Sequence, residues 1–302
     1  MKRSVILMGG KTFVLSLPSA WIKKYQIKKG EELDLEEKEN SIIVRTEKRL
    51  GDKEISVDFS CMEVMLGRAL GSLYKSGYTR AKISYGTKEQ LQNIEDVLQR
   101  SLVGFSITKQ EANYIVIESI AEAKVEEFDV SLKRLFYSLE LMNEELVTAL
   151  GSSNIQALEK VIEKDGQINR HADLCRRIIV SGQTQFLSKP AVLYYVVEQL
   201  ERIGDFYKAF AQKALEKSFV FSSSAKKIFQ EIQKIFIQFR TLFYKFSFEG
   251  FEDFGKNFYT LRIEIKKLIK DSSSEEKVLF LQQSFLLETI IDMNGALPML
   301  SL

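Results

Sequence analysis

Two short acidic motifs could bind a cation, Glu201-Arg202-Ile203-Gly204-Asp205 and Glu288-Thr289-Ile290-Ile291-Asp292. Each is a Glu-x-x-x-Asp motif within a long apolar helical pattern, and the second begins 288 − 201 = 87 residues after the first. At a spacing of four residues, both carboxylates lie on one helix face with their Cβ atoms about 6 Å apart. Two partly buried like charges are costly unless a positive group neutralises them. The repeated motif therefore predicts a metal site.

Further acids extend this predicted metal site. Glu198 lies one helical turn before Glu201, and Asp165 belongs to the preceding predicted helix. Oxygen ligands suit hard divalent cations, whereas iron and zinc usually recruit nitrogen or sulfur as well. The predicted metal-binding residues are Glu201, Asp205, Asp165, Glu198, Glu288 and Asp292.

A purely structural role for these acids is the alternative. Glu201 would then pair with Arg202 or Arg170, and Asp205 with Lys208, on a solvated face. The single histidine, His171, excludes a site built from several histidines and makes acid–base catalysis an unfavourable interpretation. Because no nucleophile, base and orienting group stand out together, we expect a non-enzymatic protein.

The first thirty residues are basic and contain no acid, although the net charge of the 302-residue chain is only +2. Such an asymmetry predicts a surface that binds a polyanion. Lysines at turns and helix ends would contact the DNA backbone, and Arg3 or Thr12 would read bases. A domain that only dimerises is the alternative. The predicted DNA-binding residues are Lys2, Arg3, Lys11, Thr12, Lys23 and Lys24.

The chain divides into three predicted domains, 1–50, 51–125 and 126–302. The first contains strands at 5–8 and 12–17, a short helix at 20–25 and a hairpin at 33–35 and 42–45. It is too small to bury a sufficient core alone, so it must dock on the rest or intertwine with a second copy. The second alternates strands and helices, in the order β-α-β-α-β-β with helices at 62–76 and 88–100, and predicts a small α/β sandwich.

The third domain shows helical periodicity almost throughout. Six helices are expected, at 127–150, 154–181, 186–217, 223–248, 251–270 and 274–297, and short turns between long helices predict an antiparallel bundle. The third and sixth match at an offset of 87, so two three-helix repeats are expected, at about 126–221 and 222–302. The phenylalanine-rich fourth helix, with Phe229, Phe236 and Phe239, should supply the core or a dimer surface. The fold class is therefore mixed and mainly α.

The remaining sequence features concern the compartment. Cys61 and Cys175 have no Cys-x-x-Cys spacing and are expected to be small core residues in a reducing environment. The apolar stretch 278–300 is interrupted by charged and amide side chains, which predicts a buried helix and no membrane insertion. With no signal-peptide pattern at the N-terminus, a cytoplasmic protein is expected.

The segment from Gln199 to Asp205, together with 161–169 on the preceding helix, resembles the signature helices of the PhoU family. That resemblance implies two three-helix repeats, iron or zinc bound at Glu/Asp-x-x-x-Asp motifs, and negative regulation of phosphate uptake. The sequence departs from the family pattern at Asn169, where an acid is expected, and on the fifth predicted helix, which lacks the acidic pair.

The first domain resembles AbrB-type swapped-hairpin DNA-binding domains. The matching segments are Gly9-Gly10-Lys11, 15–21 and 27–31. This resemblance implies an intertwined homodimer that binds DNA. The order of the two parts is similar to that of archaeal PhoU-like regulators with an N-terminal AbrB-type domain.

These interpretations predict a regulator of phosphate uptake, with an N-terminal domain that binds DNA as a dimer. The helical domain would sense a ligand, a metal or a partner. The alternative is an adaptor that binds a phosphate transporter ATPase or a sensor kinase, in which the N-terminal domain serves only for assembly.

Overall fold

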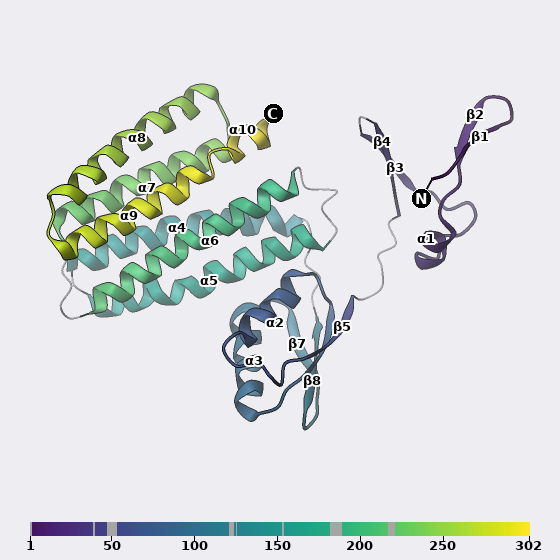
Figure 1. Cartoon of the computed structure of the whole chain (residues 1–302), viewed down its shortest axis with the longest axis horizontal. Coiled ribbons are helices and arrows are strands. Elements are labelled where there is room, and N and C mark those ends of the chain that lie inside the picture. Colours follow the sequence, from purple (N-terminus) through teal and green to yellow (C-terminus); the bar gives the residue numbers. More distant parts are fainter. Residues whose placement is uncertain are drawn as a thin grey trace. The chain divides into compact units, whose positions relative to one another are not determined.

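The computed structural model describes residues 2–38, 40–46, 53–120, 124, 126–152, 154–181, 189–216 and 221–302. The chain forms two compact units, Met1–Glu54 and Ile55–Leu302 (Figure 1). The predicted boundaries at 50/51 and at 125 lie outside the described residues, and the division into three domains stays a prediction.

The first unit contains two antiparallel hairpins and one short helix. Strand β1 (Val5–Met8) pairs with β2 (Thr12–Leu15), and β3 (Asp34–Lys38) pairs with β4 (Ser41–Arg45). The β1–β2 turn requires glycine, because Gly9 and Gly10 both adopt positive φ, at 62° and 76°. Helix α1 (Ser19–Lys24) lies between the hairpins in sequence.

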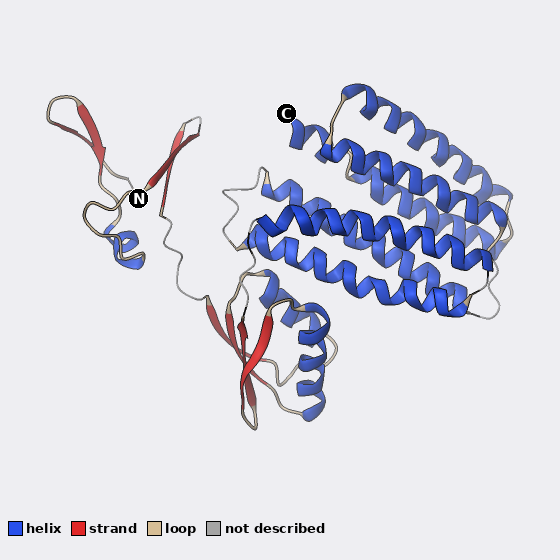
Figure 2. Cartoon of the chain, turned by 180° about the vertical axis from the view of Figure 1, so that it is seen from behind, coloured by secondary structure: helices blue, strands red, loops and turns tan. Residues whose placement is uncertain are grey.

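An α/β module opens the second unit. Its sheet has the order β5-β6-β8-β7, and helices α2 and α3 cover one face of it (Figure 2). Buried apolar side chains of the sheet and both helices form its core. The elements are β5 (Glu54–Asp58), α2 (Leu66–Lys75), β6 (Arg80–Ser84), α3 (Lys88–Ser101), β7 (Phe105–Gln110) and β8 (Tyr114–Ser119).

The periodicity predicted that the first helix of this module begins at residue 62, but helix α2 begins at Leu66. The buried amide of Gln90 explains the difference. Its Nε2 atom donates to the carbonyls of Phe59, Ser60 and Met62, at 3.2, 3.0 and 2.6 Å. Its Oε1 atom accepts from the backbone N–H of Gly86 at 2.7 Å. These bonds satisfy the loop carbonyls that a longer helix would have used.

The helical part consists of two three-helix repeats followed by a short terminal helix. Within each repeat the first and second helices pack together, as do the second and third, and the third also contacts the first. The repeats meet where α4 packs on α7 and α6 packs on α9. The helices are α4 (Glu126–Ser152), α5 (Ile155–Val180), α6 (Pro190–Leu215), α7 (Ser223–Tyr244), α8 (Phe248–Asp271), α9 (Ser274–Asp292) and α10 (Ala296–Ser301).

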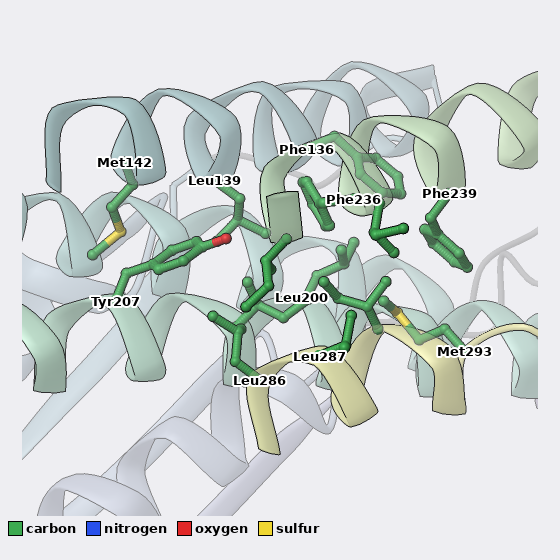
Figure 3. Close-up of a cluster of buried hydrophobic side chains, with 14 of the residues drawn as sticks. Phe136, Leu139, Met142, Leu200, Tyr207, Phe236, Phe239, Leu286, Leu287 and Met293 are labelled. Carbon is green, nitrogen blue, oxygen red and sulfur yellow. The ribbon is translucent and has the colours of Figure 1, made fainter. Parts of the chain in front are cut away.

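The contact between α4 and α7 is reciprocal in a way that fits a duplicated unit. Asn143 of α4 donates its amide to the carbonyl of Phe229, and Gln233 of α7 donates to the carbonyl of Glu140. Around this contact the core draws side chains from both repeats (Figure 3), including Phe136, Leu139, Met142, Leu200, Tyr207, Phe236, Phe239, Leu286, Leu287 and Met293. The mainly α fold and the doubled three-helix unit are therefore as the sequence predicted.

Two compartment-related predictions can be compared with the structure. Cys175 is buried as expected, but Cys61 is exposed, so the prediction of a core position for Cys61 was wrong. Residue 61 follows β5 in the turn that Gln90 holds, outside the sheet. Among the described helices, none has the length and apolarity that a membrane span requires.

Candidate functional site

A single arginine pairs with two glutamates of α6. Arg176 of α5 is 1% exposed, and its Nε atom lies 2.5 Å from the carboxylate of Glu198. Its Nη2 atom donates to Glu201, and its Nη1 atom lies 2.8 Å from Asp173. Each of the three guanidinium nitrogens therefore lies within ion-pair distance of a different carboxylate.

The electrostatics of this cluster follow from its burial. Burial alone would lower the pKa of the Arg176 guanidinium, but Glu201, Glu198 and Asp173 outweigh that effect and raise it. Burial raises the pKa of the Asp173 carboxyl, against the opposing effect of Lys75 and Arg176. Arg176 therefore stays charged at every physiological pH and already supplies the positive charge that the acidic motif requires.

Asp165, the predicted ligand on α5, faces a lysine. Asp165 of α5 is buried, and its Oδ2 atom lies 2.7 Å from Nζ of Lys208 on α6 and accepts from Asn169 at 3.2 Å. Partial burial, with the nearby carboxylates of Asp165 and Glu201, raises the pKa of the Asp205 carboxyl. Lys208 thus pairs with Asp165 across the α5–α6 contact, and not with Asp205 as the structural alternative had it.

In the second repeat, an arginine of the preceding helix also pairs with the acidic motif, but with a single carboxylate. Glu288 of α9 lies 2.7 Å from Nε of Arg262 on α8. The hydroxyl of Tyr195 donates to the backbone carbonyl of Asp292 at 3.1 Å. Both acidic motifs therefore meet an arginine from the preceding helix of their own repeat, since Arg176 and Arg262 each reach the glutamate that opens a motif.

The prediction of bound metal was wrong. Within the described part of the chain, no group of three or more His, Cys, Asp and Glu side chains could hold a metal ion. A physical reason is visible at four of the predicted ligands, Glu198, Glu201, Asp165 and Glu288. There Arg176, Lys208 and Arg262 supply the charge that a metal would have supplied. The iron, zinc or other divalent cofactor that the resemblance implied is therefore withdrawn.

The residue after Arg176 joins the bundle to the α/β module. Nη1 of Arg177 donates to the carbonyls of Tyr74 and Tyr78, at 2.6 and 2.9 Å. Its guanidinium lies 4.8 and 4.9 Å from the ring centres of Tyr74 and Phe105. Beside it, Lys75 of α2 lies 3.7 Å from Asp173. Arg176 and Arg177 thus connect the acidic face of α6 to the end of α2.

The predicted DNA-binding residues lie in the first unit, and all six are exposed. Lys2 and Arg3 precede β1, Lys11 lies in the β1–β2 turn and Thr12 opens β2. Lys23 and Lys24 form the last turn of α1. The structure does not test whether these residues contact nucleic acid, so their role in DNA binding stays a prediction.

The sequence analysis missed the arginines that organise the acidic faces. Arg202 and Arg170 were the considered partners of Glu201, yet Arg176 occupies that position. A signal was present, because Arg262 follows Arg176 by 86 residues and Glu288 follows Glu201 by 87. A search for basic residues that repeat within one residue of the 87-residue offset would have found both.

Comparisons with known proteins match different shares of the chain. Residues 6–52 match the family model described as "Antidote-toxin recognition MazE, bacterial antitoxin". The crystal structure of the phosphate transport system regulatory protein PhoU from Streptococcus pneumoniae matches 58% of this chain and 94% of its own, with 16% identity and a TM-score of 0.47. No curated protein matches the sequence significantly.

The family match falls on the N-terminal segment that resembles AbrB-type domains in sequence, and the structure found by similarity is that of a protein named PhoU. The family match covers only residues 6–52. The structural similarity, at this identity and TM-score, assigns no activity, ligand or partner to the chain.

Proposed function

We propose that this protein is a regulator that binds DNA as a homodimer through its first unit and receives a signal through its helical repeats. The observation that carries the proposal is the apolar surface of the β1–β2 hairpin. Six large apolar side chains there are more than half exposed, Val5, Ile6, Leu7, Met8, Phe13 and Leu15.

A second copy is the occupant that this hairpin requires. Its apolar residues succeed one another along both strands, so both hairpin faces are apolar. An isolated two-stranded hairpin is marginally stable in water, and a unit of this size buries too little surface alone. Pairing with a second hairpin would bury both faces. The match of residues 6–52 to an antitoxin family supports a compact recognition domain here.

DNA is the partner that the charges of the unit favour. Lys11 at the hairpin tip and the Lys23-Lys24 pair at the end of α1 are exposed cations. A dimer presents each of them twice, and phosphates spaced along a duplex bind such paired cations. Base reading would fall to Arg3 and Thr12.

The signal would reach the helical repeats. Phosphate status is the signal implied by the PhoU resemblance of the sequence. A ligand or partner could change the protein only through different affinities for two conformations. The joint formed by Arg176 and Arg177 supports this proposal, because it connects the acidic face of α6 to the α/β module.

Operator selection tests the regulator. The full-length protein would be incubated with fragmented genomic DNA, and the bound fragments sequenced. Enrichment of a defined palindrome is expected, because a twofold dimer selects two related half-sites. Sedimentation at micromolar concentration should give the mass of a dimer.

Matched lysine variants locate the contact. The double variant Lys23→Ala/Lys24→Ala should weaken binding to all DNA sequences at least fivefold, since phosphate contacts carry no sequence information. The control is Lys28→Ala/Lys29→Ala, which removes the same charge from exposed positions outside the predicted set. Equal loss in both variants would contradict the assigned residues. A dimer that binds no DNA would contradict the regulator.

The adaptor is the second candidate. The family description of residues 6–52 concerns antidote–toxin recognition, and it favours protein binding by this segment as well. The helical repeats would then bind a phosphate transporter ATPase or a sensor kinase. Retention of either protein on the immobilised full-length chain, together with absent DNA enrichment, would support this alternative.

A further inference from the structure

The contact between the α/β module and the bundle does not rest on a shared apolar core. Helices α2 and α3 both pack on α5. The buried apolar side chains of the described residues nevertheless form two separate clusters, one within the module and one within the bundle. Parts of one chain are expected to move relative to each other unless their interface is large and hydrophobic. The polar groups of this interface therefore decide how firmly the module is held.

Two cations of α2 face acids of the bundle. Nζ of Lys75 lies 3.7 Å from Oδ1 of Asp173 on α5, and the two side chains are 32% and 14% exposed. Arg68 precedes Lys75 by seven residues, so both lie on one face of α2. Burial raises the pKa of the Asp205 carboxyl on α6, and Arg68, after Lys208, opposes that rise. Because both cations of α2 are partly solvated, salt screens their attraction to these acids.

Docking of the module also buries a hydroxyl that finds no partner. Tyr74 of α2 is 1% exposed, and its hydroxyl makes no hydrogen bond within the described part of the chain. Burial raises the pKa of this hydroxyl, Arg177 opposes the rise, and Asp173 and Glu127 of the bundle add to it. A buried hydroxyl without a partner costs free energy that hydration restores. The docked state therefore carries a cost that release of the module removes.

Arg177 of α5 favours the docked state. Its Nη1 atom donates to the carbonyls of Tyr74 and Tyr78, near the end of α2, and its guanidinium lies 4.9 Å from the ring centre of Phe105. Bonding to carbonyls at a helix end and stacking on an aromatic ring are both favourable. One strong polar attachment is thus combined with screened charges and an unpaired hydroxyl, which favours docking without making it permanent.

The module also follows the first unit directly along the chain. Strand β5 begins at Glu54, where the first unit ends, and α4 of the bundle begins only at Glu126. The first unit is therefore joined to the bundle through the module. A change in how the bundle holds the module reaches the first unit without any further element between them.

We propose that the α/β module is a releasable domain, held on the bundle by Arg177 and by the charges of Lys75 and Arg68. The docked state predominates, and the released state is a minor population that increases as these charges are screened or removed. In the regulator proposed above, release of the module is the step that passes a signal from the helical repeats to the first unit. Only this last consequence rests on the proposed function.

A distance measurement between the module and the bundle tests the release. Asn93→Cys and Glu144→Cys place one spin label on α3 and one on α4, at exposed positions of the full-length chain. Cys61→Ser removes the exposed native thiol. Labelled protein would be diluted with unlabelled protein, so that a dimer holds one labelled copy. Pulsed double electron resonance should show one narrow distance at about 0.05 M salt, and a longer, broad population that is at least threefold larger at about 1 M salt.

Matched variants test which groups hold the module. Lys75→Glu should increase the longer-distance population at least threefold at low salt, and Arg68→Glu should do the same if Lys75→Glu fails to fold. Tyr74→Phe should reduce this population, because it removes the unpaired hydroxyl. The control is Lys82→Glu, the same charge change at an exposed position of β6, on the sheet face opposite the module core. It should leave the distances as in the parent chain.

Three results would overturn the proposal. The first is a single unchanged distance in the parent chain and in all variants at both salt concentrations. The second is a longer-distance population that does not respond to salt, which would leave the charges without a role. The third is an equal increase in Lys75→Glu and Lys82→Glu. None of these results depends on DNA binding, which operator selection measures separately.

Discussion

At the residue scale, the acidic motifs are balanced by cations of the chain itself. Arg176 forms ion pairs with Glu198, Glu201 and Asp173, and Lys208 forms one with Asp165. Removing one partner from such a buried pair leaves a charge without compensation, which is far costlier than replacing the whole pair. The spacing of the acids was readable in the sequence. Their partners were harder to identify, because Arg170 of the neighbouring helix was weighed as the partner of Glu201, whereas Arg176 of that same helix makes the contact.

Asp205 provides a test of this electrostatic description. Partial burial and the neighbouring carboxylates of Asp165 and Glu201 raise the pKa of its carboxyl. The protonated form therefore adds stability that is complete below the unfolded pKa of about 4 and is lost as pH rises through the folded pKa. Asp205→Asn should raise the free energy of unfolding by about 0.5 kcal/mol at pH 8, a small effect because the side chain is largely solvated.

Urea unfolding at several pH values checks this prediction. The difference in free energy of unfolding between Asp205→Asn and the parent chain should shrink towards zero near pH 3, where the aspartate is protonated. Glu163→Gln, at an exposed position of α5, is the control and should change little at either pH. A variant that is less stable than the parent at pH 8 would show that the ionised carboxylate makes a favourable contact.

At the element scale, Gly204 sets the approach of α6 to α5. A Cβ atom there would lie 3.0 Å from Cγ2 of Ile168, whereas one at Gly166 of α5 would meet nothing within 4 Å. Alanine gains about 1 kcal/mol over glycine inside a helix, but overpacking costs typically 1–3 kcal/mol. Gly204→Ala should therefore destabilise the protein by about 1 kcal/mol, and Gly166→Ala should stabilise it by a similar amount, as measured by urea unfolding. Stabilisation by both alanine variants would show that the Ile168 side chain moves away from position 204 at little cost.

Arg177 gives a second prediction for the elements, at the joint between bundle and module. Lysine cannot reproduce two hydrogen bonds from one planar group that also stacks on Tyr74 and Phe105. Arg177→Lys should lower the free energy of unfolding by about 2 kcal/mol. Calorimetry should also resolve two transitions where the parent chain shows one, since the module loses its main polar attachment.

The control for this joint is Arg170→Lys, the same change at an exposed position of the same helix. It should leave a single transition at nearly unchanged temperature. Two transitions in the parent chain, or one in both variants, would show that Arg177 does not couple the module to the bundle.

Most elements of the fold were predictable, because apolar periodicity and turn residues act locally. Helices α4 to α9 were expected within a few residues of their observed bounds, and the repeat followed from the 87-residue offset. The start of α2 was not predictable, since it depends on hydrogen bonds from Gln90, which is distant in sequence. The burial of one face of α5 was also not predictable from the sequence. Its charged residue Asp173 looks solvent-exposed in the sequence pattern but pairs with Lys75 of the α/β module.

At the scale of the whole molecule, DNA binding should be sensitive to salt. Each phosphate neutralised on a duplex contributes about −0.9 to the slope of log K against log salt concentration. A dimer that uses two or three lysines per copy should therefore give a slope near −4 to −5. Fluorescence anisotropy of a labelled duplex from 50 to about 300 mM salt measures it. Salt-independent binding would contradict phosphate contacts by the first unit.

The arginine at the centre of the α6 acids has a consequence for how the protein is handled. Arg176 is covalently part of the chain, so its positive charge cannot be lost to dilution, dialysis or a chelator. A helical half that carries its own counter-ion should fold and melt identically with and without EDTA. Growth in metal-poor medium would then yield the same protein as growth in rich medium.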